Sequence, residues 1–248
     1  MSKKKIKIIG HRGYPLKAPE NTLASFDKAV QFGADAIEFD LHISSDGRLV
    51  IHHDYALGHP DNGEGNIFQT SFSEINKVDA GKWFNQNFVG ERIPTPEQIF
   101  ERYGDRIEYE IELKGTTLEF ITKIIEVVKK FNFVHKVEFT SPHMFLLAKL
   151  KQKYPAFKTG VFFQRYPDWM NQEQGEKIIT DTLSILPADV AHIPTAILNQ
   201  NLVNKIHEQA KFVHAADCND KESIAKIAKL GCDQFSTNNV ELAINSVK

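Results

Sequence analysis

Residues 6–26 read IKIIGHRGYPLKAPENTLASF. The stretch opens with a short apolar run, continues through a polar loop that carries His11 and Arg12, and ends in residues with helical spacing of apolar side chains. Asn21 or Thr22 fits the N-cap of that helix, because both side chains accept hydrogen bonds from a first turn. This order of strand, loop and helix places reactive side chains at the carboxyl end of a strand.

The same alternation of strands and helices continues along the 248 residues. Strands are expected at 5–9, 36–43, 48–53, 107–113, 137–140, 159–163, 189–193, 212–215 and 234–236. Helices are expected at 22–32, 96–103, 117–131, 142–153, 173–182, 200–209 and 221–230. Such alternation is typical of a parallel sheet with right-handed crossovers.

One strand is surplus to an eight-stranded barrel, and the spacing identifies it. The second and third segments are too close for a crossover helix, and Ser44-Ser45-Asp46-Gly47 is a turn signal, so they are expected to form an antiparallel hairpin. The hairpin brings His53 level with Glu38 and Asp40. The other eight segments predict an α/β fold, a (β/α)₈ TIM barrel.

Residues 54–95 break this rhythm, being rich in Gly, Asn, Asp and aromatic residues. They predict a small insertion between the second and third barrel strands, over the top of the barrel, within a single domain of residues 1–248. Its aromatic residues Trp83, Phe84 and Phe88 form either a wall of the binding site or, more commonly for such residues, a small core of the insertion itself.

Composition restricts the partners and the compartment. With 30 basic and 32 acidic residues the formal charge is −2, which provides no footprint for nucleic acid or an anionic membrane, so a small-molecule partner is favoured. No apolar run is long enough for a membrane span or a signal peptide, so the protein is expected to be cytoplasmic. Cys218 and Cys232 fall at opposite ends of the predicted sheet and are expected to be packing residues without a disulfide. The oligomeric state stays open.

Carboxylates recur at every second position in two strands. Glu38 and Asp40 share one face of their strand, and Glu112 is nearest the carboxyl end of the other. Because buried ionised groups need a partner, the three acids predict one divalent cation, Mg²⁺ or Ca²⁺. The alternative is that some acids pair with Arg12, Lys114 or Arg165, and that Glu108 and Glu110 face the helices.

Two histidines follow strand ends beside these acids. His11 and His53 are candidates for a general base and a general acid, because the ordinary pKa of histidine lies near neutrality. His52 points to the face opposite His53, and Asp54 is placed to orient one of them. Structural roles are assigned to His42, His59, His135, His143, His192, His207 and His214, of which His42 also shares a face with the acids. Arg12 and Lys114 add the positive charge that an anionic phosphodiester needs.

In this order the motifs resemble the signature of the glycerophosphodiester phosphodiesterases. They are His11-Arg12-Gly13, Pro19-Glu20-Asn21-Thr22, Glu38-Phe39-Asp40, Asp46-Gly47, His53-Asp54, Asn62-Gly63, Ala80-Gly81-Lys82-Trp83-Phe84, Arg92-Ile93-Pro94-Thr95, Glu112-Leu113-Lys114 and Ser141. A lone His-Arg-Gly is a weak signal, whereas the ordered set covers most of the chain and is highly specific.

The resemblance implies a metal-dependent phosphodiesterase on a barrel with a small inserted domain. It implies that Glu38, Asp40 and Glu112 bind the divalent cation, that His11 and His53 are the acid/base pair, and that Arg12 and Lys114 contact the phosphate. It further implies attack by the substrate glycerol's own hydroxyl, a cyclic phosphate that water opens, and release of sn-glycerol 3-phosphate and an alcohol such as choline or ethanolamine.

Three departures from the family pattern lie outside this inner set. They are His59-Pro60-Asp61 before Asn62-Gly63, Ala216-Asp217-Cys218-Asn219 in place of Trp-Thr-Val-Asn, and Thr237-Asn238-Asn239-Val240 in place of Thr-Asp-x-Pro. Ala216 removes a large wall of the pocket, which leaves open which alcohol is preferred and whether lysophospholipids or other phosphodiesters are substrates. A non-catalytic barrel that binds a phosphate ligand is a different class, and the presence of both histidines argues against it.

Overall fold

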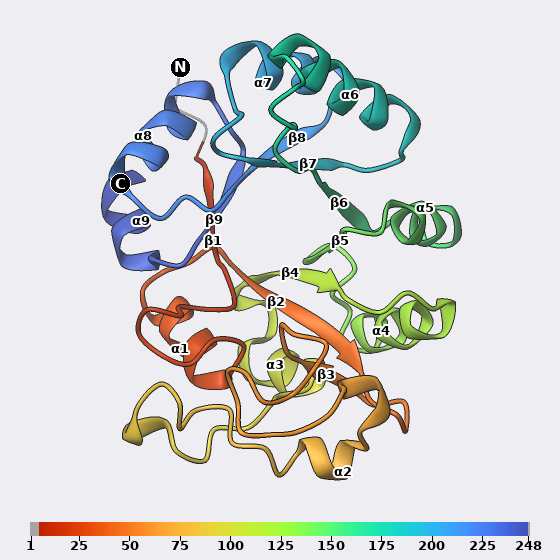
Figure 1. Ribbon diagram of the computed structural model, residues 1–248, viewed down its shortest axis with the longest axis vertical. Helices are drawn as coiled ribbons and strands as arrows, with labels where there is room; N and C mark the ends of the chain where they lie inside the picture. Colours follow the sequence, from red (N-terminus) through yellow and green to blue (C-terminus); the bar gives the residue numbers. More distant parts are fainter. Residues whose placement is uncertain (1–4, 248) are drawn as a thin grey trace.

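Eight parallel strands close into a barrel in the computed structural model, which describes residues 5–247. The barrel strands are β1 (Lys7–Gly10), β2 (Ala36–Ile43), β4 (Glu108–Leu113), β5 (Val137–Ser141), β6 (Lys158–Phe162), β7 (Val190–Pro194), β8 (Phe212–Ala216) and β9 (Gln234–Thr237). Strand β1 closes the ring because it pairs with β9 on one side and with β2 on the other (Figure 1). The predicted TIM barrel is confirmed.

Helices follow the barrel strands and cover the outside of the ring. They are α1 (Leu23–Gln31), α3 (Pro96–Tyr103), α4 (Leu118–Lys130), α5 (Met144–Lys153), α6 (Gln172–Ile185), α7 (Gln200–Glu208), α8 (Lys221–Leu230) and α9 (Val240–Val247). Thr22 is the N-cap of α1, since its side chain accepts from the Ser25 N–H. Helix α9 has no counterpart among the expected helices. Within residues 5–247, no helix combines the length and the apolar composition that crossing a bilayer requires.

The surplus strand is β3 (Leu49–Ile51), which folds back on β2 as predicted. The pair is antiparallel, with Leu41 opposite Ile51 and Ile43 opposite Leu49. Beyond the strand, the His52 N–H donates to the Asp40 carbonyl at 3.0 Å. This register returns the chain to the level of the acidic residues of β2, which places His53 beside them.

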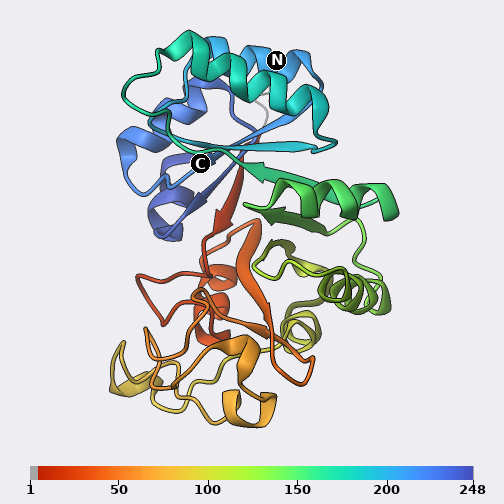
Figure 2. The ribbon, with the colours of Figure 1, turned by 45° about the vertical axis from the view of Figure 1, so that its right-hand side comes forward.

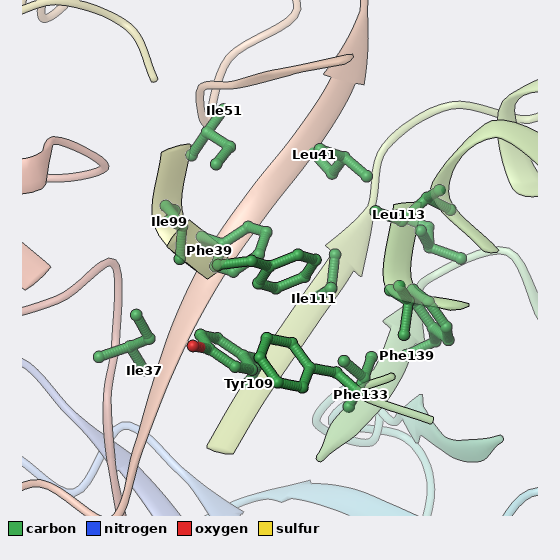
Figure 3. Close-up of a cluster of buried hydrophobic side chains, with 14 of the residues drawn as sticks. Ile37, Phe39, Leu41, Ile51, Ile99, Tyr109, Ile111, Leu113, Phe133 and Phe139 are labelled. Carbon is green, nitrogen blue, oxygen red and sulfur yellow. The ribbon is translucent and has the colours of Figure 1, made fainter. Parts of the chain in front are cut away.

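The largest hydrophobic core lies between the barrel and its helices. Figure 3 shows Ile37, Phe39 and Leu41 of β2 beside Tyr109, Ile111 and Leu113 of β4. All six are nearly fully buried, and burying a side chain of this size contributes about 1.5–3 kcal/mol. Because side chains alternate along a strand, the acids between these residues must face the barrel interior.

The alternative raised by the sequence is right in one part and wrong in the other. Some acids do pair with Arg12 and Lys114. Glu110 does not face the helices, because it lies on the same face of β4 as Glu112 and is 3% exposed inside the barrel. Glu108 shares that face but lies at the opposite end of the strand, where it pairs with Lys7.

The insertion follows β3 and forms one end of the molecule, beside β3 and α3 and far from α6 and α7 (Figures 1 and 2). Its short elements are two 3₁₀ turns and one helical turn, η1 (Ile67–Gln69), η2 (Gln86–Phe88) and α2 (Phe72–Ile75). It has a small core of its own, which consists of Val50, Leu57, Ile67, Ile75, Val78, Ala80 and Ile93. Trp83, Phe84 and Phe88 pack edge to face on one another outside that core.

Both cysteines are buried and unbonded, as expected. Burial raises the pKa of Cys218 to about 11 and that of Cys232 to about 12. Neither thiol is therefore ionised near neutral pH, which fits a packing role.

Candidate active site

A tight loop after β1 presents His11 and Arg12 at the carboxyl end of the barrel. Arg12 and Gly13 have φ values of 53° and 89°, in the left-handed region. A Cβ atom on Gly13 would lie 2.5 Å from the Ser25 hydroxyl, so only glycine fits here. The same hydroxyl donates to the Arg12 carbonyl at 2.9 Å, which ties the loop to α1.

The three predicted metal ligands meet in space. One oxygen from each of Glu38, Asp40 and Glu112 lies within 4.8 Å of the others. Glu38 and Asp40 are buried, and Glu112 is half-buried. The arrangement follows from the register of the sheet, in which Asp40 of β2 is paired with Glu112 of β4.

The two basic residues predicted to bind phosphate, Arg12 and Lys114, contact these acids. The Arg12 backbone N–H donates to Glu38 at 2.8 Å, and its side-chain Nε lies 3.4 Å from Asp40 Oδ2. Lys114 Nζ lies 3.0 Å from Asp40 Oδ1 and 2.7 Å from Glu112 Oε1. These cations therefore lie directly beside the acidic cluster.

The two buried acids respond to this environment in opposite directions. Burial raises the pKa of Glu38 well above its ordinary value, and the charges of Asp40, Glu110 and Glu112 raise it further. Burial also raises the pKa of Asp40, but the positive charges of Lys114 and Arg12 outweigh it and the net pKa is lowered. Among the three acids, Glu38 is thus the one whose carboxyl makes no ion pair with a lysine or arginine of residues 5–247.

The charges at this site suit a divalent cation. Four carboxylates and two cations meet here: Glu20, Glu38, Asp40, Glu112, Arg12 and Lys114. With all four carboxyl groups ionised they leave two negative charges in excess, which one divalent ion would balance. A cation beside Glu38 would favour its ionised form, against the effect of burial. Oxygen ligands of this kind are those that Mg²⁺ and Ca²⁺ prefer.

Each of the two candidate acid/base histidines is oriented by a hydrogen bond at its Nδ1 atom. The Nδ1–H of His11 donates to Asn238 Oδ1 at 2.7 Å, and that of His53 donates to Asp54 Oδ1 at 2.7 Å. Both rings line one cavity of about 320 Å³. This arrangement leaves Nε2 of each ring as the nitrogen that can exchange a proton.

The cavity of about 320 Å³, called the inner cavity from here on, is also lined by one of the departures from the family pattern, Ala216. Ala216 and Asp217 line it at the end of β8, together with Phe162 and Phe163. A second cavity of about 580 Å³ lies beside the insertion and includes Trp83 in its wall. His53 lines both cavities, so the site has two lobes that meet at this imidazole.

Several residues at the site were not assigned a role from the sequence. Asn21 Nδ2 donates to Asp40 Oδ2 at 2.8 Å, and Glu20 accepts from Arg12 at 2.8 Å. Asn238 is the partner of His11. The only sequence signal for Glu20 and Asn21 was that they belong to a recognised motif. The only signal for Asn238 was that it lies in a segment that departs from the family pattern.

The histidines assigned structural roles divide into two groups. His42 contacts the Tyr55 ring and is buried, which lowers its pKa to about 4, so a structural role fits. His192 and His214, in contrast, lie inside the barrel against Glu110, within ion-pair distance of its carboxylate. They form a second polar cluster that the sequence pattern did not reveal.

Comparisons with known proteins agree with this geometry. The model of the glycerophosphoryl diester phosphodiesterase family matches residues 11–242. A glycerophosphodiester phosphodiesterase of Caldanaerobacter subterraneus is 32% identical, over 97% of each chain. Among solved structures, an Oleispira antarctica phosphodiesterase in complex with the product sn-glycerol-3-phosphate is 28% identical with a TM-score of 0.84, covering 98% of this chain and 97% of that one. A glycerophosphodiester phosphodiesterase of Agrobacterium tumefaciens is 26% identical with a TM-score of 0.83, covering 97% and 99%.

Proposed function

This chain belongs to the glycerophosphoryl diester phosphodiesterase family, and from that premise we propose that it hydrolyses glycerophosphodiesters to sn-glycerol 3-phosphate and an alcohol. The observation that carries the proposal is the meeting of three carboxylates and two oriented histidines at one cavity. The product bound in the Oleispira antarctica phosphodiesterase supports the same reaction. We also propose that residues 1–248 form one domain, with about 54–95 as an inserted subdomain.

The charged residues would bind the phosphate together with a cation. Glu38, Asp40 and Glu112 would hold one Mg²⁺ or Ca²⁺, which supplies Lewis-acid stabilisation of the phosphoryl oxygens. Arg12 and Lys114 already lie beside these acids and would place their remaining N–H groups on the phosphate. Preorganised positive charge at this position stabilises the charge that develops in the transition state.

The histidines would transfer the protons. One imidazole takes the proton of the glycerol hydroxyl that attacks the phosphorus, and the other protonates the departing alcohol as the P–O bond breaks. In the second step water opens the cyclic phosphate and the two roles reverse. Asn238 and Asp54 would keep each ring in the tautomer with a proton on Nδ1, so that Nε2 faces the reaction.

A bulkier alcohol group is the second candidate, because Ala216 leaves the inner cavity without the family's tryptophan. A lysophospholipid or another phosphodiester would then be the preferred substrate. The same enzyme and the same residues serve both candidates, so the substrate alone distinguishes them.

The test is a substrate panel with the purified full-length chain. Glycerophosphocholine, glycerophosphoethanolamine and a lysophospholipid are supplied with Mg²⁺ or Ca²⁺, and release of each product is measured. We expect glycerol 3-phosphate from at least one glycerophosphodiester, and no activity after the cation has been removed by a chelator. Failure to release glycerol 3-phosphate from any of them would refute the proposed function.

Variants test the acid/base roles. His11→Ala and His53→Ala should each lower kcat by about 10²–10⁴-fold, the usual contribution of a general acid or base. The control is His135→Ala, because His135 is exposed and lies outside the cavity of the candidate site. Circular dichroism should show an unchanged fold in all three. Unchanged turnover in the His11 and His53 variants would remove these residues from the mechanism.

A further inference from the structure

A second cluster of ligating side chains lies inside the barrel, apart from the three carboxylates of the candidate site. Glu110 of β4, His192 of β7 and His214 of β8 are 3%, 1% and 1% exposed. One ligand atom of each lies within 4.8 Å of the others. We call these three residues the interior cluster.

The ring of His192 is fixed in an orientation typical of a metal ligand. Its Nε2 donates to Glu138 Oε1 at 2.7 Å, and Glu138 Oε2 is in turn bonded to Lys158 at 2.8 Å and to Gln234 at 3.0 Å. An imidazole that donates one N–H to a carboxylate exposes a lone pair on its other nitrogen, as metal-binding histidines do. Here that nitrogen is Nδ1, and it faces Glu110 at 3.8 Å.

The backbone makes room for this bond. A Cβ atom on Gly160 of β6 would lie 2.3 Å from His192 Nε2 and 2.7 Å from Glu138 Oε1. Any other residue would push the pair apart, and so glycine at this position permits the orientation of His192.

Two buried atoms of the interior cluster make no hydrogen bond. They are Glu110 Oε2 and His192 Nδ1. Buried polar atoms without a partner are unfavourable, and one cation between these two atoms would satisfy both. Glu138 is balanced by Lys158, whereas the charge of Glu110 has no lysine or arginine paired with it among the described residues.

The distances suit a small divalent ion. Oε1 of Glu110 lies 3.8 Å from His192 Nδ1, and its Oε2 lies 3.3 Å from His214 Nδ1. Ligands about 2.0–2.1 Å from a tetrahedral ion are separated by about 3.3 Å from one another. The His192 and His214 rings stack at 4.0 Å with 23° between their planes, so binding by both requires one ring to turn. Both His214 and Glu110 line the cavity of about 320 Å³, which gives an ion access to the cluster.

His214 Nδ1 already has a polar neighbour. It lies 3.2 Å from Gln234 Nε2, so a cation bound at this nitrogen would take the place of that hydrogen bond. Burial lowers the pKa of His214 to about 4, so the imidazole is neutral near pH 7, the form that binds metals.

We propose that Glu110, His192 and His214 bind a second divalent cation, separate from the site of Glu38, Asp40 and Glu112. Two imidazoles and one carboxylate form a ligand set that suits borderline ions such as Zn²⁺ and Co²⁺, whereas the all-oxygen site suits Mg²⁺ and Ca²⁺. The barrel would thus hold two cations of different chemical preference on neighbouring strands, since Glu110 is paired in register with Glu38.

The test is a titration of the metal-free full-length chain with Co²⁺, followed by calorimetry and visible absorption. We expect a second equivalent of Co²⁺ with the strong visible absorption of a nitrogen-ligated, low-coordinate ion. Zn²⁺ should abolish that absorption by competition, and excess Mg²⁺ should not. A single equivalent with the weak spectrum of an all-oxygen site would overturn the proposal.

Variants test whether the second equivalent of Co²⁺ is bound by the interior cluster. Glu110→Gln and His214→Asn should each weaken this equivalent by more than about 100-fold, beyond the 10–100-fold effect typical of outer-shell partners. Asp40→Asn should weaken the other equivalent and leave the absorption band. His135→Asn is the matched control, since it removes an exposed histidine. Glu110→Gln preserves size and hydrogen bonding, so it stays informative if His214→Asn does not fold. A second equivalent that survives both cluster variants, or is lost in the His135 control, would contradict the proposal.

Discussion

Asn21 acts on the acid Asp40 and not on the helix that follows it. Its Nδ2 donates to Asp40 Oδ2 at 2.8 Å, and its φ is 55°, while the neighbouring Thr22 caps α1. Asparagine is enriched among the non-glycine residues that adopt this left-handed conformation. The sequence pattern allowed either residue as the N-cap, because a local pattern does not specify a positive φ.

Replacing Asn21 should therefore weaken cation binding. Asn21→Gly keeps the left-handed backbone accessible and removes the amide that holds Asp40, so we expect the affinity for Mg²⁺ or Ca²⁺ to fall roughly 10–100-fold by calorimetry. Asn21→Ala should in addition lower the free energy of unfolding by about 1–2 kcal/mol, because alanine is strained at positive φ. Equal affinities in the wild type and the glycine variant would show that Asn21 does not position the acid.

Asn238 should matter for turnover through His11. Asn238→Ala removes the oxygen that accepts the Nδ1–H bond, so the ring loses its preferred orientation. We expect kcat to fall by roughly 10-fold or more with a smaller change in KM. Asn238→Asp restores an acceptor oxygen at the same position and should recover turnover. If both variants fail equally, Asn238 serves another purpose.

At the scale of elements, the β2–β3 hairpin is joined to the insertion through His52. Its Nε2 lies 2.8 Å from Asp61 Oδ2, and Asp61 Oδ1 accepts from the backbone of Gly58 and Gly63 at 3.0 and 2.6 Å. Because neighbouring residues point to opposite faces, His52 anchors the insertion while His53 faces the site. The residues His59-Pro60-Asp61, which depart from the family pattern, thus supply this anchor.

The anchor should make stability depend on pH. Burial lowers the pKa of His52, but the hydrogen bond and charge of Asp61 outweigh it, so the net pKa is raised above 6.5. A raised histidine pKa stabilises the fold below the unfolded value and loses that contribution as pH rises through the folded value. Urea unfolding should show that His52→Gln lowers the free energy of unfolding by about 1.5–3 kcal/mol near pH 6. This difference between wild type and variant should become smaller towards pH 9. A difference in unfolding free energy that is the same from pH 6 to pH 9 would exclude an ion pair between His52 and Asp61.

Elements were predictable where the pattern is local. The period-two alternation in 36–43 and 107–113, with the turn signal between Asp40 and His53, was enough for the strands and the hairpin. Helix α9 was not predicted, although with eight residues it is as long as α3, which was. Helix α3 begins with Pro96 directly after Thr95, a start signal that the sequence before α9 lacks.

At the scale of the whole molecule, the excess negative charge at the site should couple cation binding to folding. Saturation with Mg²⁺ or Ca²⁺ at about 100 times the dissociation constant should stabilise the native chain by about 2.7 kcal/mol. For a chain of this size that corresponds to a rise in Tm of about 5–10 °C, measured by calorimetry. The shift should vanish in Glu38→Gln, in which a proposed ligand of the cation is replaced by an amide. A Tm indifferent to cation in the wild type would contradict the site.

That the candidate site residues lie close together was predictable from the sequence to the extent that they sit at strand ends in recognisable motifs, as His11 and Glu112 do. Their positioning partners were not, because the contacts join distant parts of the chain. The contact of His192 with Glu138 is of this kind, since it needs the register of three strands and a glycine on the one between them. Only the closed barrel brings such residues together.

Closure of the barrel also determines when the candidate site can form during translation. Strand β1 pairs with β9, and His11 is held by Asn238, 227 positions later in the sequence. The chain emerges from its amino end, so His11 is made early but has neither its neighbouring strand nor its partner until translation has passed residue 238. A nascent chain should therefore stay catalytically silent until β9 and Asn238 have left the ribosome. A premature stop after α8 would leave β1 and β8 as open edges that can pair with other chains, making the truncated product a target for aggregation rather than a weakened enzyme.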